Sequence, residues 1–163
     1  MKVIGIDPGT ASCGYGIVQE RDGRLRAIDH GWWRTPAAQR LELRLKTIFD
    51  GVAALVEEHR PDAVAIEESF VGVDARTALS VGQARGAVMV AAANAGVECA
   101  EYPPARVKQV VCGYGRAEKQ QVQKMVKAIL SLQTAPTPSH ASDALAVAIC
   151  HALAPPLLKV VAG

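Results

Sequence analysis

The stretch MKVIGIDPGTASCGYGIV, residues 1–18, decides the fold of this chain. Its run Val3-Ile4-Gly5-Ile6 is short, apolar and uninterrupted, as in strands that are buried on both faces of a sheet. The turn signal Asp7-Pro8-Gly9 ends this run, and residues 14–18 resume the apolar pattern. The stretch therefore predicts a central strand followed by an antiparallel neighbour.

The sequence beyond this stretch predicts three further strands. A polar turn at residues 21–24 leads into a third strand over residues 25–35, which completes an antiparallel meander. Two later apolar segments, residues 63–66 and 97–102, follow helical segments, so we expect them to join the sheet as parallel strands. The predicted fold class is α/β, with a five-stranded mixed sheet made of a three-strand antiparallel meander and two parallel strands.

Helices are predicted between and after the later strands. Apolar residues recur every three or four positions over residues 38–60, and Pro61 stops the pattern. A helix rich in Ala, Gly and Val follows over residues 75–95. Three more are expected, beginning near residue 104, over 118–132 and from 139. With no internal repeat or linker, residues 1–163 are predicted to form one domain, with a short tail over about 154–163.

Composition limits the class of protein. A chain of 163 residues, half of them apolar, fits one globular domain, and its net charge of +2 argues neither for nor against a polyanionic partner. The four cysteines lack the spacing of a zinc site or a disulfide framework, so we expect reduced thiols. A signal peptide and an apolar run of about 20 residues are both lacking, which predicts a cytoplasmic protein with no membrane partner.

Two apolar strands end in carboxylates, Asp7 and Glu67. If these strands are parallel neighbours, their carboxyl ends place both side chains at the sheet edge where α/β folds bind ligands. Oxygen ligands of this kind suit Mg²⁺ or Mn²⁺. The alternative is that Asp7 caps a turn and Glu67 points into solvent. Glu68 is expected on the opposite face from Glu67, as a solvated neighbour.

The last predicted helix opens with Pro-Ser-His-Ala-Ser-Asp, residues 138–143. Ser139 is the predicted N-cap and Asp143 is expected in the first turn. His140 and Asp143 are three residues apart and so share one helical face. Because the apolar run 144–149 follows, the helix should pack into the core and point both groups at the sheet edge. The alternative is an Asp143 that only complements the helix dipole beside an exposed His140.

Residues 104–127 form a basic segment. They contain six basic residues and one acidic residue, a net charge of +5, which leaves 12 basic and 15 acidic residues, or −3, for the rest of the chain. Such a segment beside an acidic metal site is typical of nucleases, since neutralising phosphates supplies most of the sequence-independent affinity for DNA. The alternative is a solvated helix face.

Taken together, these motifs resemble the RuvC-type Holliday junction resolvases, nucleases of the RNase H-like fold that cut four-way DNA junctions. The similar motifs are GIDPGTASCGYGIV, IEESF, GQARG at residues 82–86, VKQVVCGYGRAEKQQV and SHASDALAVAICH. They occur in the order of the family and span residues 1 to about 153. The resemblance implies an RNase H-like sheet flanked by helices and a crossover junction endodeoxyribonuclease activity in DNA recombination and repair.

The resemblance implies catalytic and metal-binding roles for Asp7, Glu67, His140 and Asp143. These residues would hold two divalent cations, Mg²⁺ or Mn²⁺, roughly 4 Å apart for phosphodiester hydrolysis. Some family members carry Asp at the position of His140. An imidazole is a softer ligand than a carboxylate and favours Mn²⁺.

The resemblance also implies DNA contacts and partners. Lys108 and Lys119 are expected near the scissile phosphate, and Phe70 is expected either to distort the junction by stacking or to pack on the core. The full set of predicted DNA-binding residues is Phe70, Arg76, Arg106, Lys108, Arg116, Lys119 and Lys124. Four-way junction DNA, a homodimer formed through the helix at residues 75–95, and a branch-migration motor complex are the implied partners.

Trp32 and Trp33 are adjacent, so in a strand one faces inward and one outward. We interpret this pair as structural.

Three other functions fit parts of the sequence. A different RNase H-like nuclease, such as one that processes ribosomal RNA precursors, would share the carboxylates. A non-catalytic DNA-binding module would keep the basic segment without needing four convergent metal ligands. A nucleotide-binding ATPase of the actin and sugar-kinase type opens with a similar strand and hairpin, but that fold is duplicated and far longer.

Overall fold

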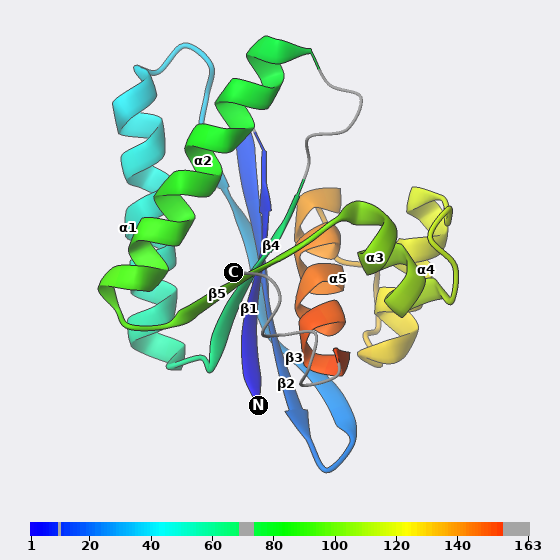
Figure 1. Ribbon diagram of the computed structural model, residues 1–163. Helices are drawn as coiled ribbons and strands as arrows, with labels where there is room; N and C mark the ends of the chain where they lie inside the picture. The colour runs from blue at the N-terminus through cyan, green and yellow to red at the C-terminus, as the bar shows by residue number, and fades with distance from the viewer. Residues whose placement is uncertain (10, 69–73, 155–163) are drawn as a thin grey trace.

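A five-stranded mixed sheet carries helices on both faces in the computed structural model, which describes residues 1–9, 11–68 and 74–154 (Figure 1). The strands are β1 (Lys2–Pro8), β2 (Ser12–Arg21), β3 (Arg24–Arg34), β4 (Ala63–Glu67) and β5 (Glu98–Tyr102). The helices are α1 (Leu41–His59), α2 (Ala75–Asn94), α3 (Pro104–Cys112), α4 (Lys119–Ile129) and α5 (Ser139–Leu153).

The strand order is β3-β2-β1-β4-β5, with β1 at the centre. β2 pairs antiparallel with β1 and with β3, whereas β4 pairs parallel with β1 and with β5. The predicted meander and the two predicted parallel strands are both confirmed.

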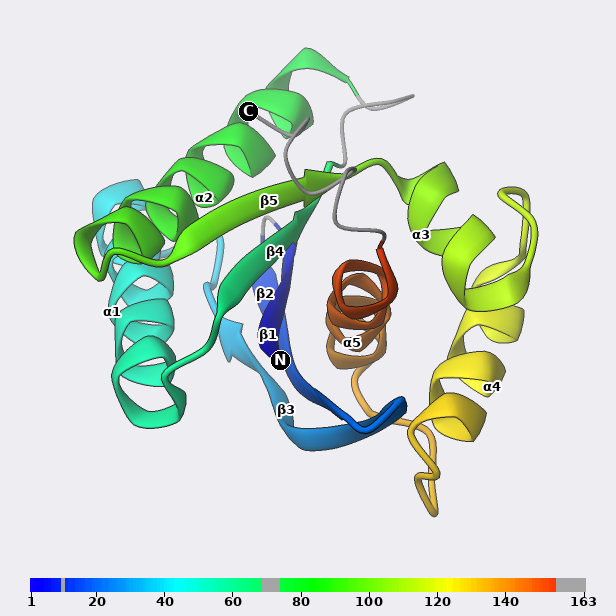
Figure 2. The ribbon, with the colours of Figure 1, turned by 60° about the horizontal axis from the view of Figure 1, so that its bottom comes forward.

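Side chains alternate across β1 and build a core on each face of the sheet. Ile4 and Ile6 pack with residues of α1 and α2, whereas Val3 packs in the cluster that contains Leu145 of α5. Figure 2 shows α1 and α2 over one face and α5 over the other, with α3 and α4 outside α5. The burial of β1 on both faces agrees with its apolar sequence.

The backbone of helix α5 packs directly on glycines of the sheet. A Cβ atom at Gly14 would overlap the carbonyl of His140, and one at Gly5 would overlap the carbonyl of Ala144. These positions on β1 and β2 therefore have no room for a side chain. Because no side chain fills these two positions, the first residues of α5 can lie beside the end of β1.

The N-cap prediction for Ser139 is wrong. Pro138 is the cap residue, with φ −67° and ψ 176°, and Ser139 is the first residue of α5. The ring of Pro138 fixes φ near the value required there, and its missing N–H is not needed at a helix start. The first turn of α5 contains no acidic residue, so Asp143 lies beyond it.

Two predicted helices are shorter in the structure than the sequence pattern suggests. Before α1, the N–H of Gln39 donates to the carbonyl of Pro36 at 3.0 Å, which forms a turn where we expected helix. After α4, Ser131 adopts a positive φ of 53°, which ends the helical run.

Strand β3 contains a bulge that changes which face its side chains occupy. Val18 pairs with Ala27 but the preceding Ile17 pairs with Asp29, so Ile28 is an extra residue. Ala27 packs under α5, whereas beyond the bulge Trp33 packs with the α1 and α2 cluster. The exposed side chains of β3 therefore lie on the α1 and α2 face before Ile28 and on the α5 face after it.

The cysteines are free thiols in the structure, as predicted, with Cys13 and Cys150 buried and Cys99 and Cys112 partly buried. Across the described residues, no helix has both the length and the apolar character needed to cross a bilayer.

Candidate metal and DNA-binding site

Asp7 and Glu67 lie at neighbouring strand ends. β1 and β4 pair in parallel register through Ile6 and Ile66, so the next residue of each strand reaches the same edge of the sheet. Asp7 is buried and Glu67 is half-buried. The expected juxtaposition of the two strand ends is therefore present.

Helix α5 brings an imidazole and a third carboxylate to this edge. The His140 Nδ1 atom lies 2.8 Å from Oδ2 of Asp7. Asp7, His140 and Asp143 each offer a ligand atom, and these atoms all lie within 4.8 Å of one another. The contact joins residues that are 133 positions apart, and it depends on the glycine-lined approach of α5 to the sheet.

Glu67 experiences the charge of this cluster although its carboxylate is not one of the three clustered groups. Burial, followed by the charges of Asp7 and Asp143, raises the pKa of Glu67 to about 7. Burial is also the main reason that the pKa of Asp143 is raised. Negative charge at this edge is therefore costly in the absence of a cation.

His140 interacts favourably with the same negative charge. Its hydrogen bond with Asp7 is the largest cause of the raised pKa of its imidazole. Protonation of the ring would add positive charge beside these carboxylates.

Two lysines from the basic segment complete the site. Nζ of Lys119 donates to Oδ2 of Asp143 at 2.7 Å, and the charges of Lys119 and Lys108 both lower the pKa of Glu67. These lysines share a pocket with both carboxylates; its lining is Glu67, Pro104, Val107, Lys108, Lys119, Val122, Asp143 and Ala146. The sequence predicted both lysines as DNA contacts, but it did not predict the ion pair between Lys119 and Asp143.

The donor set fits a divalent cation. It combines carboxylate oxygens, which suit Mg²⁺ and Mn²⁺, with one imidazole nitrogen, which suits the softer of the two. The ammonium of Lys119 forms an ion pair with Asp143, and the ring of His140 contacts Asp7, so both groups lie on carboxylates that a cation would bind. The structure thus brings these side chains together in an acidic site that is able to hold a metal ion.

The remaining predicted DNA-binding residues are spread more widely. Arg106 is half-buried on α3, whereas Arg116 and Lys124 are exposed in the segment that contains α4. Arg76 is exposed at the start of α2, where its backbone N–H donates to the capping Asp74. Phe70 lies outside the described residues.

Glu68, expected on the opposite face from Glu67 as a solvated neighbour, is half-buried in the structure. Its charge helps to raise the pKa of Arg85 on α2, whose guanidinium pairs with Glu101 of β5. The sequence did not predict this ion pair, because its partners are distant in sequence and on different elements.

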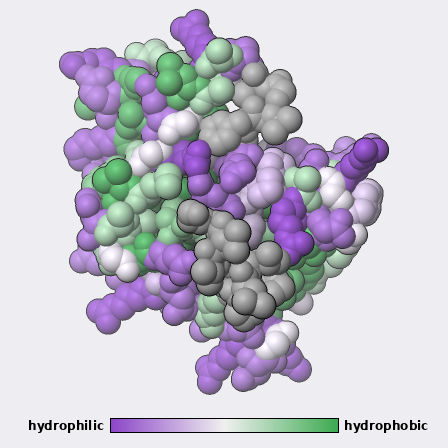
Figure 3. All heavy atoms as spheres, viewed as in Figure 1, coloured by the Kyte–Doolittle hydropathy of each residue, from purple (hydrophilic) through white to green (hydrophobic). Residues whose placement is uncertain are grey.

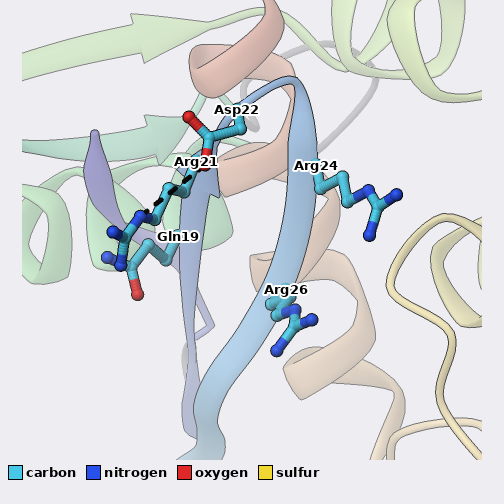
Figure 4. A pocket seen from close by; sticks show the side chains of 5 residues that line it. All are labelled: Gln19, Arg21, Asp22, Arg24 and Arg26. Atoms are coloured by element: carbon cyan, nitrogen blue, oxygen red, sulfur yellow. Dashed lines mark ion pairs between the residues drawn. The ribbon is translucent and has the colours of Figure 1, made fainter.

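A second group of cationic side chains lies at the tip of the β2–β3 hairpin, at the other end of the sheet (Figures 1 and 4). Arg21 and Arg24 are paired across the hairpin, and with Gln19, Asp22 and Arg26 they line a shallow pocket. The tip lies beyond the first residues of β1, so it is remote from Asp7.

Comparison with known proteins matches this chain to a protein family. The family model described as "Crossover junction endodeoxyribonuclease RuvC" matches residues 3–151. The chain is 48% identical over 163 residues to the Crossover junction endodeoxyribonuclease RuvC of Desulfitobacterium hafniense, a match that covers 100% of this chain and 99% of that protein. Identity to the protein of the same name from Syntrophomonas wolfei is 53% over 151 residues, or 93% of this chain and 88% of that one.

Solved structures of RuvC proteins are also similar to this chain. The structure of Thermus thermophilus RuvC is 41% identical, with a TM-score of 0.86 and 93% of each chain covered. The T. thermophilus RuvC in complex with a Holliday junction substrate gives a TM-score of 0.89 at the same identity and coverage. The yeast mitochondrial Holliday junction resolvase Ydc2, at 11% identity and a TM-score of 0.62, shares the fold.

These matches confirm the RNase H-like fold and the resemblance seen in the sequence motifs. They do not favour a nuclease that processes ribosomal RNA precursors or a non-catalytic DNA-binding module. A family model that matches nearly the whole chain, together with relatives about half identical over its length, shows that this chain belongs to the RuvC family of crossover junction endodeoxyribonucleases.

Proposed function

We propose that this chain resolves four-way DNA junctions by paired symmetric nicks, as one cytoplasmic nuclease domain over residues 1–163 that acts in homologous recombination and DNA repair. The observation that carries the proposal is the convergence of Asp7, His140 and Asp143 within 4.8 Å, beside two lysines at one sheet edge. The Holliday junction bound to the T. thermophilus relative supports four-way junctions as the substrate class.

We propose Asp7, Glu67, His140 and Asp143 as the residues that hold two divalent cations, Mg²⁺ or Mn²⁺. The three clustered donors and the raised pKa of Glu67 support this assignment. When bound, such cations supply Lewis-acid activation of water and stabilisation of the leaving oxygen in phosphodiester hydrolysis. The imidazole of His140, in place of the carboxylate that some relatives carry, supports a preference for Mn²⁺.

The residues of the chain itself perform the binding and orienting steps. Lys119 and Lys108 stand beside Glu67 and Asp143, so their ammonium groups are available to bind the phosphate at which cleavage occurs. Lys119 uses one of its three N–H donors on Asp143, and the other two are available to a phosphate. The glycine-lined contact between α5 and the sheet fixes His140 and Asp143 relative to Asp7.

More distant basic residues extend the proposed DNA surface. The exposed side chains of Arg76, Arg116 and Lys124, with the half-buried Arg106, are proposed contacts to backbone phosphates. Phe70 keeps its proposed role as a stacking residue at the junction, on the strength of the family resemblance.

We propose that the protein is a homodimer, because a four-way junction with two-fold symmetry must be nicked twice. The exposed face of α2 supports this arrangement. Leu79 is 64% exposed and Val90 is 53% exposed, and the intervening Gly82 and Gly86 have open space around them. Figure 3 shows apolar side chains along α2, while hydrophilic side chains predominate over α3 and α4. The family resemblance supports a branch-migration motor as a further partner.

Nicking of a synthetic four-way junction tests the proposal. Wild-type protein should make paired nicks with Mg²⁺ or Mn²⁺, whereas Asp7→Asn should bind the junction with unchanged affinity and cut it at least about 100-fold more slowly, since it lacks a metal ligand. Asp50→Asn, which alters an exposed carboxylate on α1, is the matched control and should cut normally. Equal cutting by wild type and Asp7→Asn would refute the assignment of the site.

A further inference from the structure

We propose that Trp32 and Arg34 form a second DNA contact of the active site, in which Trp32 stacks on a base and Arg34 binds a backbone phosphate. This contact lies on the β3 flank of α5, away from the basic helices α3 and α4. The inference rests on the proposed function and specifies how the substrate strand is held.

Trp32 lies in the same row of the sheet as the metal-binding carboxylate. Asp7 of β1 pairs with Gly14 of β2, and Gly14 pairs with Trp32 of β3. Since adjacent strands are about 4.8 Å apart, the Cα atoms of Asp7 and Trp32 are separated by about 10 Å. One or two nucleotides of a bound DNA strand can span this separation.

The three members of this row face the same side of the sheet. Gly14 faces α5, because a Cβ atom there would overlap the carbonyl of His140. Asp7 also faces α5, because it contacts the ring of His140. Directly paired residues in antiparallel strands point to the same face, so Trp32 stands on the α5 side as well. The bulge at Ile28 is what moves the exposed side chains of β3 to this side.

The two adjacent tryptophans have different surroundings. Trp33 stacks on Tyr15 with ring centroids 4.9 Å apart and packs against Gly51 of α1. Its role is structural, as the sequence suggested. Trp32 instead is 49% exposed, which leaves its indole ring accessible beside the metal site.

Positive or hydrogen-bonding side chains flank Trp32 on the same face. His30 and Arg34 lie two residues to either side, both are exposed, and neither forms an ion pair with any residue that the structure describes. Arg34 pairs with Ser12, at the end of β2 that meets the catalytic edge. A cation beside an exposed aromatic ring is the arrangement with which proteins bind single-stranded nucleic acid.

The proposed contact at Trp32 and Arg34 lies on the opposite flank of α5 from the two lysines of the site. α5 packs on the central strands, β3 is the strand at one edge of the sheet, and α3 follows β5 at the other edge. A strand that crosses the start of α5 would meet Lys108 and Lys119 on one flank and Trp32 and Arg34 on the other. The competing explanation is that polar side chains on β3 only protect an edge strand from pairing with another chain.

Tryptophan fluorescence tests the stacking directly. The chain has two tryptophans, so Trp33→Phe leaves Trp32 as the sole emitter, and Trp32→Phe leaves Trp33. A four-way junction added without divalent cation should quench the emission of Trp33→Phe in a saturable manner and leave that of Trp32→Phe nearly unchanged. Equal responses from the two variants would overturn the proposal.

Binding measurements separate DNA contact from edge protection. Trp32→Ala should weaken junction binding about tenfold, the loss expected from one base stack, and Trp32→Phe should restore most of it. The matched control is Ile28→Ala, because Ile28 is 44% exposed on the same strand. Arg34→Gln should reduce the slope of log affinity against log salt by about one, whereas Arg24→Gln at the hairpin tip should not.

The outcomes distinguish this inference from the proposed function. If wild-type protein fails to bind and nick the junction, the proposed function is wrong. If wild-type protein does both, and Trp32→Ala and Arg34→Gln bind like Ile28→Ala and Arg24→Gln, then the second contact does not exist and the exposed residues of β3 only protect the edge.

Discussion

The ammonium of Lys119 pairs with Asp143, one of the carboxylates proposed to hold a divalent cation. It lies 2.7 Å from the Asp143 carboxylate, and its charge also lowers the pKa of Glu67. The same side chain is a proposed phosphate contact. If Asp143 holds a cation, as proposed, its ion pair with Lys119 would weaken and the ammonium would be more available to the DNA, which would couple metal binding to substrate binding at a single residue.

Lys119→Ala should consequently have opposite effects on two measurements. In DNA-free protein it should strengthen Mn²⁺ binding by roughly two- to fivefold, because it removes a partly exposed ion pair worth less than about 1 kcal/mol. It should nevertheless slow nicking and flatten the salt dependence of junction binding. Electron paramagnetic resonance of free Mn²⁺ measures the first effect, with Lys124→Ala as the control. Weaker Mn²⁺ binding by Lys119→Ala would contradict the coupling.

At the scale of elements, α2 carries exposed apolar side chains on its outer face. Leu79 and Val90 are both more than half exposed, and they are separated by three helical turns. Exposed apolar side chains on one helix are typical of a surface that another protein copy covers.

Val90→Asp should therefore produce monomers that nick junctions without pairing the two cuts, because a buried charge at a dimer interface is strongly unfavourable. Light scattering measures the mass, and a cruciform plasmid distinguishes single from paired nicks. Leu153→Asp, at an equally exposed position on α5, should remain dimeric. Paired nicking by a Val90→Asp monomer would disprove the need for a dimer.

For the whole molecule, the distribution of charge matters more than the net charge of +2. The basic segment supplies α3 and α4, and the buried carboxylates gather at one sheet edge. Because repulsion among these carboxylates opposes folding, a cation that binds only the folded protein should stabilise the entire chain.

Mn²⁺ at 100 times its dissociation constant should raise the free energy of unfolding by about 2.7 kcal/mol for each site that it fills. Urea titrations with and without Mn²⁺ measure this increase. Asp7→Asn should lose most of it, whereas Asp50→Asn on the surface of α1 should keep it. An Asp7→Asn protein that is stabilised as much as wild type would show that the cation binds elsewhere.

The sequence predicted the parts of the fold that depend on local pattern. The apolar run before Asp7 and the similar run before Glu67 were sufficient to predict two parallel strands with adjacent ends. The spacing of His140 and Asp143 likewise predicted a shared helical face, and the structure places both beside Asp7.

The sequence could not predict features that depend on contacts between residues distant in the chain. Neither Gly14 nor His140 indicates by itself that one packs beneath the other, and Lys119 gives no sign that it reaches Asp143. Strict alternation along β3 would also place Arg26 and Trp32 on one face. A bulge has no dependable sequence signature, so this face assignment needed the structure.

The extra residue in β3 also has a consequence for changes in the length of the hairpin. Because Ile28 is unmatched in β2, deleting it would join Ala27 to Asp29 opposite Val18 and Ile17, and every pair on either side would keep its partner. The hairpin can therefore lose this residue without shifting the row that contains Asp7. A change in chain length at this point would therefore leave the strand register beside Asp7 unaltered.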